Sequence, residues 1–572
     1  MSNRRSYLAL VLHAHLPFVR HPEHARHLEE RWLYEALVEC YLPLLDAFDR
    51  MAETGPTFAL TMSVTPPLAA MLKDELLRRR FDEYLGRAEA LAHREMGRLY
   101  GDARFAPIAA FYRDHFARMR GVWDKHGGDV VAGFVRHWDA GRLDLLTCSA
   151  THCYLPGMVP AREGIRPQLE LGVRGFERIV GRTPTGAWLA ECAYDPSFDS
   201  EIARAGIRFT IVDTHGLLHA RPRPPFGPYA PVCSESGVAF FARDVESGKE
   251  VWSRDAGYPG DAYYRDFYRD IGFDLAEPDL MGEVAADGSR LMTGLKYFRI
   301  TGRDAEKLPY QPGVAREKAM QHADDFVAKR VQQLKSLADT MTHPPIVVAP
   351  YDAELFGHWW FEGPIFLEAV YRKLADHADG VEAITLREYL QRHPVCAQAT
   401  PSASSWGAGG YGAVWVGREA AWIWRHVHHA TRYTRWLVQN HRGAEGPAGR
   451  ALDQALRELL LLQSSDWPFI LKMGTATRYA EARLRVHAHR LRHLGHLVET
   501  GTIEGSELAW LDDLCARDNF FQALTGDELR RAFVESPVTS EPEGARPRPA
   551  GRTMNAGPRP AELMTIDWGD PP

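Results

Sequence analysis

Short apolar or β-branched runs alternate with helical stretches over the first two thirds of the chain. Short runs of this kind separated by helices indicate parallel strands joined by crossovers. Seven such runs predict a (β/α) barrel. A further run, Ala239–Arg243, is an eighth candidate, but its neighbours have the composition of a loop or an insertion. The seven runs are Ala9–Leu12, Phe58–Val64, Leu143–Cys148, Ala187–Ala190, Phe209–Val212, Ile346–Ala349 and Glu382–Leu386.

Longer patterns predict helices in two other regions. Lys73–Arg136 is rich in Leu, Arg and Ala, and we expect it to form helices inserted after the second strand. From Gly417 onward, three stretches with apolar residues at helical spacing predict amphipathic helices. Their many His and Arg side chains are expected on solvated faces.

These patterns predict the domain organisation. Residues 1–405 should form the catalytic barrel domain with its inserted helices and loops, including a small inserted domain at approximately 195–245. Residues 406–535 should form a C-terminal α-helical domain. Residues 536–572 contain eight prolines and few apolar residues, so we expect this tail to be disordered.

Composition and charge narrow the classes of function. The 572 residues are 45% apolar and 25% charged, as expected for a globular chain with a sizeable core. The net charge of −7 argues against nucleic acid or a membrane surface as the main partner. No apolar stretch is long enough to span a membrane, and the N-terminus lacks a signal-peptide cleavage site. Seven cysteines without a CxxC motif indicate a reducing, cytoplasmic setting.

Ionisable side chains gather where the predicted strands end. Glu191 follows the apolar run "GAWLA", and Asp352 follows "IVVAPY". The C-terminal ends of barrel strands carry the active site in such folds. One acid there is more often a helix cap or an ion-pair partner, but two acids flanked by Trp188, Trp359 and Trp360 favour catalysis. Glycosidic bond cleavage needs such a pair, one acid as nucleophile and the other as proton donor.

The second acidic segment leaves a choice open. Asp352 and Glu354 are two residues apart and could share a face, so spacing does not decide which is the acid. Glu362 lies farther along and is expected to be a cap or a surface charge. The aromatic neighbours would raise the pKa of one acid and offer a surface for sugar rings.

Two other classes of function use the same residues. Five side chains near strand ends could ligate a metal ion in a metal-dependent barrel hydrolase, because HxH on a first barrel strand is a common ligand arrangement. They are His13, His15, His152, Asp213 and His215. A non-catalytic glucan-binding protein would use the Trp faces alone.

Several longer motifs occur together between residue 13 and about 407. They are "HAHLPF", "TCSATHCYLP", "WLAECAY", "APYDAELFGHWWFEGP" and "ATPSASSWG". With them the chain resembles glycoside hydrolase family 57, in particular its 1,4-α-glucan branching enzymes. The motifs "GYPGDAYYRDFYRDIGFD" and "SSDWPF" strengthen the resemblance to the branching enzymes. This set is more specific than any single motif, and it favours a glycosidase over a metal-dependent hydrolase.

The resemblance implies a seven-stranded (β/α) barrel with a small inserted domain and a C-terminal helical domain. It implies a retaining mechanism without metal or cofactor, with Glu191 as nucleophile and Asp352 as acid/base. The expected substrate is an α-glucan such as amylose or a glycogen-like polymer, in which α-1,4 bonds are cut and remade as α-1,6 branches. The family also contains α-amylases and 4-α-glucanotransferases, which stay as alternatives.

The resemblance also implies substrate contacts. His13, His15 and His152 should line the subsite next to the scissile bond. Tyr229, in the Pro-rich loop 220–236, should hang over the cleft and shield the covalent intermediate from water. The other expected glucan contacts are Arg265, Gly282, Trp360, Trp406, Trp415 and Asp466.

Overall fold

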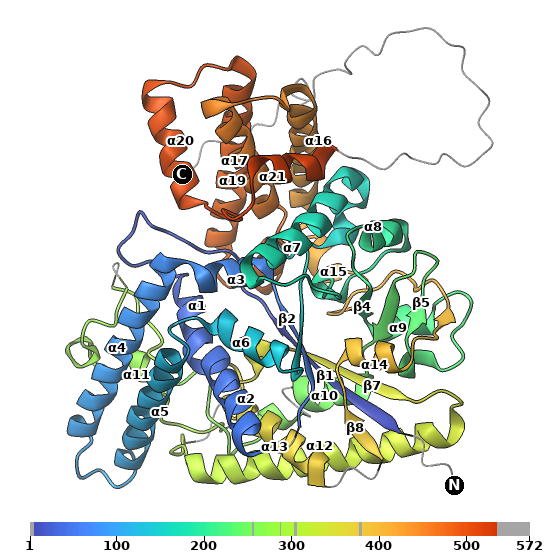
Figure 1. Cartoon of the computed structure of the whole chain (residues 1–572). Coiled ribbons are helices and arrows are strands. Elements are labelled where there is room, and N and C mark those ends of the chain that lie inside the picture. Colours follow the sequence, from blue (N-terminus) through green and yellow to red (C-terminus); the bar gives the residue numbers. More distant parts are fainter. Residues whose placement is uncertain are drawn as a thin grey trace.

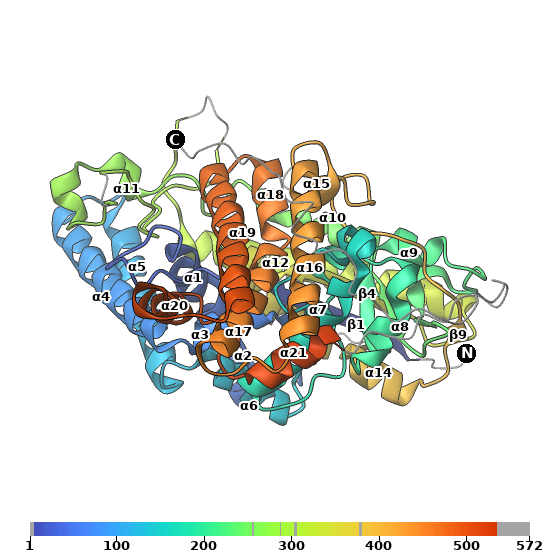
Figure 2. The ribbon, with the colours of Figure 1, turned by 90° about the horizontal axis from the view of Figure 1, so that it is seen from above.

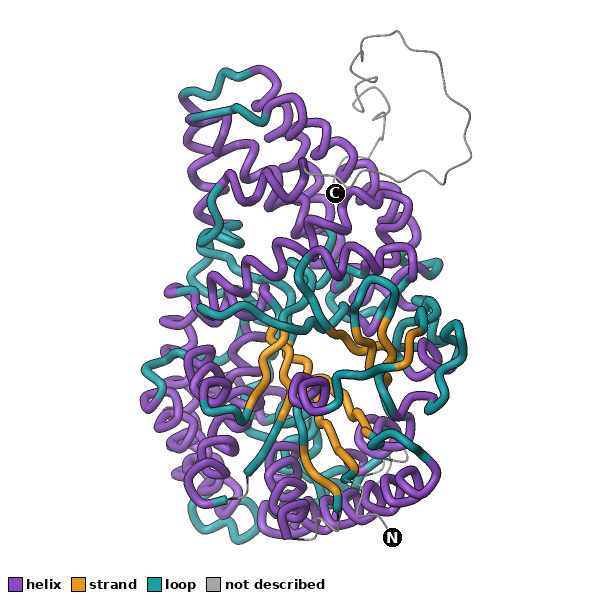
Figure 3. Tube along the Cα trace, turned by 45° about the vertical axis from the view of Figure 1, so that its right-hand side comes forward, coloured by secondary structure: helices purple, strands orange, loops and turns teal. Residues whose placement is uncertain are grey.

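The fold is described from a computed structural model of the whole chain. It describes residues 5–55, 57–253, 257–285, 288–301, 306–376 and 380–534. The predicted disordered tail, 536–572, lies outside these residues. Strands occupy the middle of the molecule and helices surround them (Figure 3). The C-terminal helices sit together at one end (Figure 1).

The central sheet is built from parallel strands. Its order is β3 (Leu143–Leu146), β2 (Leu60–Val64), β1 (Ser6–Ala14) and β7 (Ile346–Asp352). β2 pairs with residues 10–14 of β1, and the short β8 (Val381–Ala383) pairs with residues 6–8 of the same strand. All four pairings are parallel, as the alternation of apolar runs and helices predicts.

A second sheet has the order β4 (Phe209–Val212), β6 (Ala239–Ala242), β5 (Val232–Cys233) and β9 (Ala397–Gln398). Three isolated parallel bridges join it to the central sheet. Thr147, just after β3, pairs with Ala187, and Gly186 pairs with Phe209 of β4. On the other side, Arg243, just after β6, pairs with Val348 of β7.

Five of the seven predicted strand runs form strands at the predicted places: β1, β2, β3, β4 and β7. The other two differ. Residues 187–190 make bridges only, because the chain turns into the short 3-10 helix Ala190–Cys192. Residues 382–386 give only the short β8 before α14 (Leu386–Arg392) begins. The eighth candidate, 239–243, forms the paired strand β6, so its loop-like neighbours were misleading.

Alternating residues of β1 face two different apolar cores. Tyr7, Ala9 and Val11 pack with one face of β4, β6 and β7, and α14 closes this inner core. Leu8, Leu10 and Leu12 pack on the other side against the surrounding helices. Both faces of the strand are therefore covered, which explains why its sequence is apolar throughout.

Helices fill the outer layer. The predicted helices after the second strand are α3 (Pro66–Lys73), α4 (Glu75–Arg98), α5 (Ala106–Lys125) and α6 (Val130–Asp139). The long α12 (Pro312–Thr340) runs beside α13 (Gly363–Asp376), and α10 (Val245–Trp252) follows β6 (Figure 1). None of the helices in the described ranges combines the length and apolar character needed to cross a membrane.

The C-terminal helices pack around a buried ionic cluster. Three long helices lie side by side (Figure 2): α16 (Ala421–His441), α17 (Gly446–Leu462) and α19 (Thr477–Thr500). Three shorter helices pack against them: α18 (Asp466–Met473), α20 (Gly505–Arg517) and α21 (Gly526–Val534). Glu458, His487 and Asp518 meet in their interior, and Arg483 and Arg490 pair with Asp518. The prediction that His and Arg side chains of these helices are solvated is therefore wrong for His487 and Arg483, which are buried.

One glycine is required where the chain leaves β7. Gly357 has φ +120°, and a Cβ built on it would lie 1.8 Å from the carbonyl oxygen of Glu39. Because this contact is with backbone, it cannot be relieved by a side-chain rotation. Gly357→Ala should lower the free energy of unfolding by at least about 3 kcal/mol in chemical denaturation. The control is Gly101→Ala, where φ is also positive (+84°) but the space is open. Equal losses for the two variants would contradict the packing argument.

Candidate active site

The site lies at the C-terminal ends of β1, β2 and β7. His13 of β1 is the register partner of both Asp352 of β7 and Ser63 of β2. Residues that pair in a parallel sheet present their side chains on the same face. The three side chains therefore enter the same space, and Nδ1 of His13 lies 3.2 Å from the hydroxyl of Ser63.

A strained turn presents Glu191. Glu191 has φ +67° and the next residue, Cys192, has φ +49°, both in the left-handed region that non-glycine residues rarely adopt. The turn comes shortly after Gly186 and Ala187, which bridge to Phe209 and Thr147. A hydrogen bond of 2.9 Å from the backbone N–H of Trp406 to the carbonyl of Glu191 holds the turn in place. Backbone strain of this kind is concentrated at functional sites.

Both oxygens of the Glu191 carboxylate accept hydrogen bonds. The indole N–H of Trp406 donates to Oε2 over 2.8 Å, and the hydroxyl of Ser465 donates to Oε1 over 2.8 Å. The side chain is buried, with 7% of the residue exposed. Ser465 comes from the linker between α17 and α18, so the C-terminal helices contribute directly to this carboxylate.

Burial raises the pKa of Glu191 to about 7. The hydrogen bonds from Trp406 and Ser465 oppose this shift, and the charges of Asp352 and Asp466 add to it. These two hydrogen bonds keep the anionic form accessible near neutral pH. That is the form a nucleophile needs.

Asp352 has a different environment. Burial raises its pKa to about 7, the neighbouring charge of Glu354 adds to the shift, and His15 and Arg243 oppose it. Within the described parts of the chain, no group is hydrogen-bonded to its carboxylate. Glu354, in contrast, accepts hydrogen bonds from the backbone of His15 and from the hydroxyl of Tyr41. Asp352 is thus the acid whose oxygens are left for a substrate.

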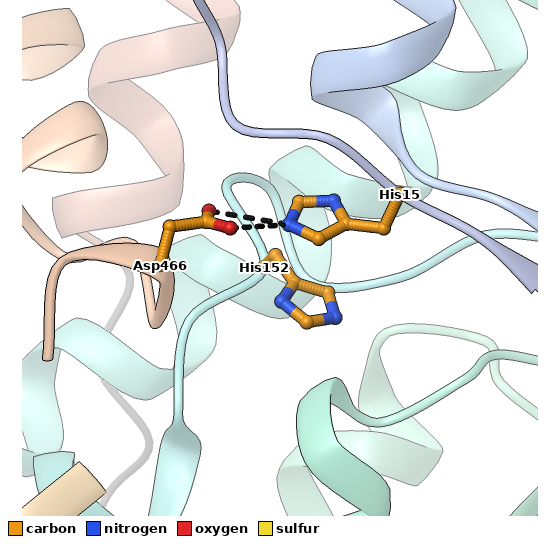
Figure 4. Close-up of side chains that lie close together, drawn as sticks. All are labelled: His15, His152 and Asp466. Atoms are coloured by element: carbon orange, nitrogen blue, oxygen red, sulfur yellow. Dashed lines mark hydrogen bonds and ion pairs between the residues drawn. The ribbon is translucent and has the colours of Figure 1, made fainter. Parts of the chain in front are cut away.

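Three histidines stack beside the carboxylates. The rings of His15 and His152 lie 3.7 Å apart, and Nε2 of His13 lies 2.9 Å from Nε2 of His152. His15 Nε2 is 3.1 Å from Oδ1 of Asp466, the first residue of α18 (Figure 4). The face of His13 stacks on the buried Trp188 at 4.6 Å. Burial lowers the pKa of both His13 and His152 well below the usual value, so these rings are neutral near pH 7.

The predicted metal ligands are not brought together as a set. His15, His152 and Asp466 have potential ligand atoms within 4.8 Å of one another, but each nitrogen of the two rings already has a hydrogen-bond partner. Asp213 and His215 instead bond to each other at 3.2 Å, and His215 Nε2 donates to the carbonyl of Gly410. The structure thus brings His13, His15 and His152 together beside Asp466, and Asp213 and His215 have other partners.

Several predicted glucan contacts lie outside the cluster. The Arg265 side chain is buried, pairs with Glu39 at 3.0 Å and lies over the ring of Phe361. Trp360 is 1% exposed and packs against Phe366, whereas its neighbour Trp359 is 58% exposed. Trp415 is also buried, stacked on Tyr154, and Gly282 lies in an exposed turn with φ +80°.

Glu362 was expected to be a cap or a surface charge, but it is fully buried. Its carboxylate accepts hydrogen bonds from the backbone N–H of Arg265 and from the hydroxyl of Tyr310.

Tyr229 is likewise not brought to the carboxylates. Phe226 of the same loop stacks on His343. His343 lies three residues before β7 begins, whereas Asp352 is the last residue of β7. This part of the loop therefore lies toward the opposite end of the strand, which does not suit a shield over Glu191 and Asp352.

Two features of the site were missed in the sequence. The first is Ser465, which is part of "SSDWPF" and is a direct hydrogen-bond partner of Glu191. The second is a match between neighbouring strands. The spacing His13-x-His15 on β1 is repeated by Ser63-x-Thr65 at the end of β2, and His15 Nδ1 lies 2.9 Å from the Thr65 hydroxyl. The signal was present, because alternate residues share a face, but only the strand register reveals the pairing.

Comparison with known proteins identifies the family. The model of glycosyl hydrolase family 57 matches residues 9–398, and the model of the 1,4-alpha-glucan branching enzyme C-terminal region matches residues 426–526. The chain belongs to glycosyl hydrolase family 57, and it is an enzyme whose helical region is of the branching-enzyme type.

Individual relatives agree with this assignment. The 1,4-alpha-glucan branching enzyme of Thermococcus kodakarensis is 31% identical, over 91% of this chain and 78% of its own. The solved branching enzyme of Pyrococcus horikoshii has a TM-score of 0.81 and 31% identity, covering 95% of this chain and 100% of its own. The alpha-amylase AmyC of Thermotoga maritima has a TM-score of 0.85 and 38% identity, covering 92% and 99%.

The two raised carboxyl pKa values predict a narrow pH profile. If Glu191 is the nucleophile and Asp352 the acid, as the family resemblance implies, protonation of Glu191 below about pH 7 and ionisation of Asp352 above about pH 7 both stop the reaction. The kcat/KM of the enzyme should therefore fall on both sides of a maximum near pH 7. Glu354→Gln removes a charge that raises the pKa of Asp352, so the alkaline limb should move to lower pH. An alkaline limb that stays or moves to higher pH would contradict this electrostatic assignment.

Proposed function

We propose that the protein is a 1,4-α-glucan branching enzyme that works by a retaining double displacement. It cuts an α-1,4 bond of an amylose-like or glycogen-like chain and transfers the cut chain to a 6-hydroxyl. The observation that carries the proposal is the contrast between the two acids. Glu191 has both oxygens held by donors, as a nucleophile requires, whereas no group among the described residues is hydrogen-bonded to the carboxylate of Asp352.

The reaction needs two steps that conserve the anomer. Glu191 attacks the anomeric carbon and forms an ester bond, while Asp352 donates a proton to the oxygen of the departing chain. The 6-hydroxyl of an acceptor glucan then attacks the same carbon, Asp352 takes the hydroxyl proton, and the ester bond to Glu191 breaks. Branching results when this acceptor is used instead of water.

We infer that the strands form the seven-stranded barrel of the family. Three bridges support this inference, because they link β3 to the 186–188 segment, that segment to β4, and β6 to β7. β6 then takes the seventh place that residues 382–386 were predicted to fill. We also propose a catalytic domain at 1–405, with the small inserted domain at approximately 195–245, and a helical domain at 406–535. The extents of the two family models support the division between barrel and helices.

The proposed sugar contacts are side chains that converge near the two acids. Asp466 would accept hydrogen bonds from hydroxyls of the sugar ring at the cleavage point. The rings of His13, His15 and His152 would line that subsite, because their nitrogens are already hydrogen-bonded within the protein. Among the paired tryptophans, Trp359 has the exposed face that stacking needs, so we propose it in place of Trp360. The seven free cysteines support a reducing, cytoplasmic location, where a glycogen-like polymer would be the substrate.

An α-amylase is the second candidate. The likeness to AmyC of Thermotoga maritima favours it, because the identity of 38% exceeds the 31% found with the two branching enzymes above. Two carboxylates serve hydrolysis and transfer equally well. The helical region that matches the branching-enzyme model favours branching.

Incubation with amylose distinguishes the two candidates. A branching enzyme should create α-1,6 linkages, counted by proton NMR, with few new reducing ends. An α-amylase should release reducing ends and create no α-1,6 linkages. Reducing ends that greatly outnumber new branches in the same sample would overturn the proposal and establish the α-amylase.

Substitution of the two acids tests the mechanism. Glu191→Gln keeps the size of the side chain but cannot form the ester, so turnover should fall by at least about 10⁴-fold, beyond what loss of acid–base help alone costs. Asp352→Asn should lose about 10²- to 10⁴-fold, because proton transfer is removed and the nucleophile remains. Near-normal turnover by Glu191→Gln would show that the nucleophile is wrongly assigned. Circular dichroism of both variants serves as the folding control.

A further inference from the structure

A continuous chain of hydrogen bonds runs from β2 to the nucleophile. It begins at the Ser63 hydroxyl, 3.2 Å from Nδ1 of His13, and continues from Nε2 of His13 to Nε2 of His152 over 2.9 Å. Nδ1 of His152 lies 2.8 Å from the Ser465 hydroxyl, which lies 2.8 Å from Oε1 of Glu191. The four links join the end of β2, the end of β1, the loop after β3 and the C-terminal helices.

The charge of the last member fixes the direction of every link. An ionised carboxylate can only accept, so Ser465 donates its proton to Glu191 and must accept one from Nδ1–H of His152. A neutral ring has one donor and one acceptor nitrogen, so Nε2 of His152 accepts from Nε2–H of His13. Nδ1 of His13 then accepts from Ser63, which starts the chain as a donor.

Burial of the two rings supports this order. Both are at most 3% exposed, and their lowered pKa values leave them neutral near pH 7. A charged His152 would carry protons on both nitrogens, and the 2.9 Å contact between the two Nε2 atoms would then bring two N–H groups together. The order of donors therefore requires a neutral His152 with its proton on Nδ1, and burial keeps His13 neutral with its proton on Nε2.

A second, parallel chain uses the next pair of residues. The Thr65 hydroxyl lies 2.9 Å from Nδ1 of His15, and Nε2 of His15 lies 3.1 Å from Oδ1 of Asp466. It ends on a different carboxylate, that of Asp466, which follows Ser465 directly and is the first residue of α18. It thus offers a comparison in which the same kinds of group lead to Asp466 instead of Glu191.

We propose that Ser63, His13, His152 and Ser465 form a directional hydrogen-bond chain, and that Ser465 is the positioning residue through which this chain orients Glu191 and stabilises its charge. The inference deepens the proposed function and rests on it, since it assumes that Glu191 is the nucleophile. Its consequence falls on the charge of the carboxylate. That charge is consumed when the ester forms and reappears when the acceptor hydroxyl displaces Glu191, so a donor to Oε1 assists departure in the second step.

The test compares the pH profile of kcat/KM on amylose between the full-length enzyme and variants in which the hydrogen-bond chain is interrupted. Ser465→Ala should lower kcat/KM at pH 7 by about 10- to 100-fold, the usual effect of losing a hydrogen bond to a charged group. It should also move the acid limb to higher pH, because Glu191 loses a donor that favours its ionised form. Ser465→Thr keeps the hydroxyl and should restore the acid limb. An acid limb that does not move in Ser465→Ala would overturn the proposal.

Ser63→Ala tests the far end of the chain, where no contact with Glu191 exists. Without its donor, His13 can adopt the other tautomer, His152 follows, and the Ser465 proton is no longer committed to Glu191. The acid limb should again move to higher pH, by less than in Ser465→Ala. The double variant should match Ser465→Ala alone, because the chain is already cut. Additive shifts would show two independent packing effects and overturn the chain.

Thr65→Val is the matched control, because it removes the hydroxyl that starts the parallel chain. It should leave the position of the acid limb unchanged, whatever happens to the rate.

Glu191→Gln distinguishes a failure of the proposed function from a failure of the hydrogen-bond chain. If that variant stays active, the nucleophile assignment and the proposed function fail. If it is inactive while the limb of Ser465→Ala stays in place, only the hydrogen-bond chain fails. Should Ser465→Ala not fold, the limb of Ser63→Ala decides alone.

Discussion

A buried carboxylate needs hydrogen-bond donors, and this need determines how the active site is assembled. Removing an ionised group from water is costly unless the protein replaces the lost water contacts. Glu191 receives its two donors from Trp406 and Ser465, neither of which lies on a strand. The first follows the short strand β9 and the second joins α17 to α18. The hydrogen bonds to the Glu191 carboxylate are therefore complete only when the turn that carries it, the segment after β9 and the C-terminal helices are in contact.

The strands add a second constraint, their register. Because β1 pairs in parallel with both β2 and β7, His13 has Ser63 on one side and Asp352 on the other. A shift of one residue would turn each of these side chains to the opposite face. The same register sets Ser63 and Thr65 opposite His13 and His15, so each histidine has a hydroxyl neighbour. Register thus determines which hydroxyl each histidine contacts and places Asp352 beside His13.

Much of this arrangement could be predicted from the sequence. Five strand positions, the helices after the second strand and the C-terminal helices follow from apolar periodicity. Acids at strand exits indicate Glu191 and the pair Asp352 and Glu354 as candidates, whereas the choice of Asp352 comes from the family resemblance. The errors have physical causes. Exposure is set by tertiary packing, which is why Trp360 is buried while Trp359 beside it is exposed. The Pro-rich loop could be identified as a loop, but composition does not say which end of β7 it faces, and Phe226 of this loop stacks on His343, which precedes β7. Ser465 has no strand context, so only the packing of the α17–α18 linker reveals its role.

The linker between α17 and α18 couples the position of the helical domain to the chemistry. Ser465 donates to Glu191, and the next residue, Asp466, accepts from His15. A small displacement of this linker would remove one donor from the nucleophile and one acceptor from the histidines at the same time. The strength of a hydrogen bond falls steeply as its length and angle depart from the ideal. The region matched by the branching-enzyme C-terminal model, 426–526, includes these two residues. The C-terminal helices therefore contribute directly to the surroundings of Glu191, and their match to the branching-enzyme model bears on the proposed reaction as directly as the match of residues 9–398 does.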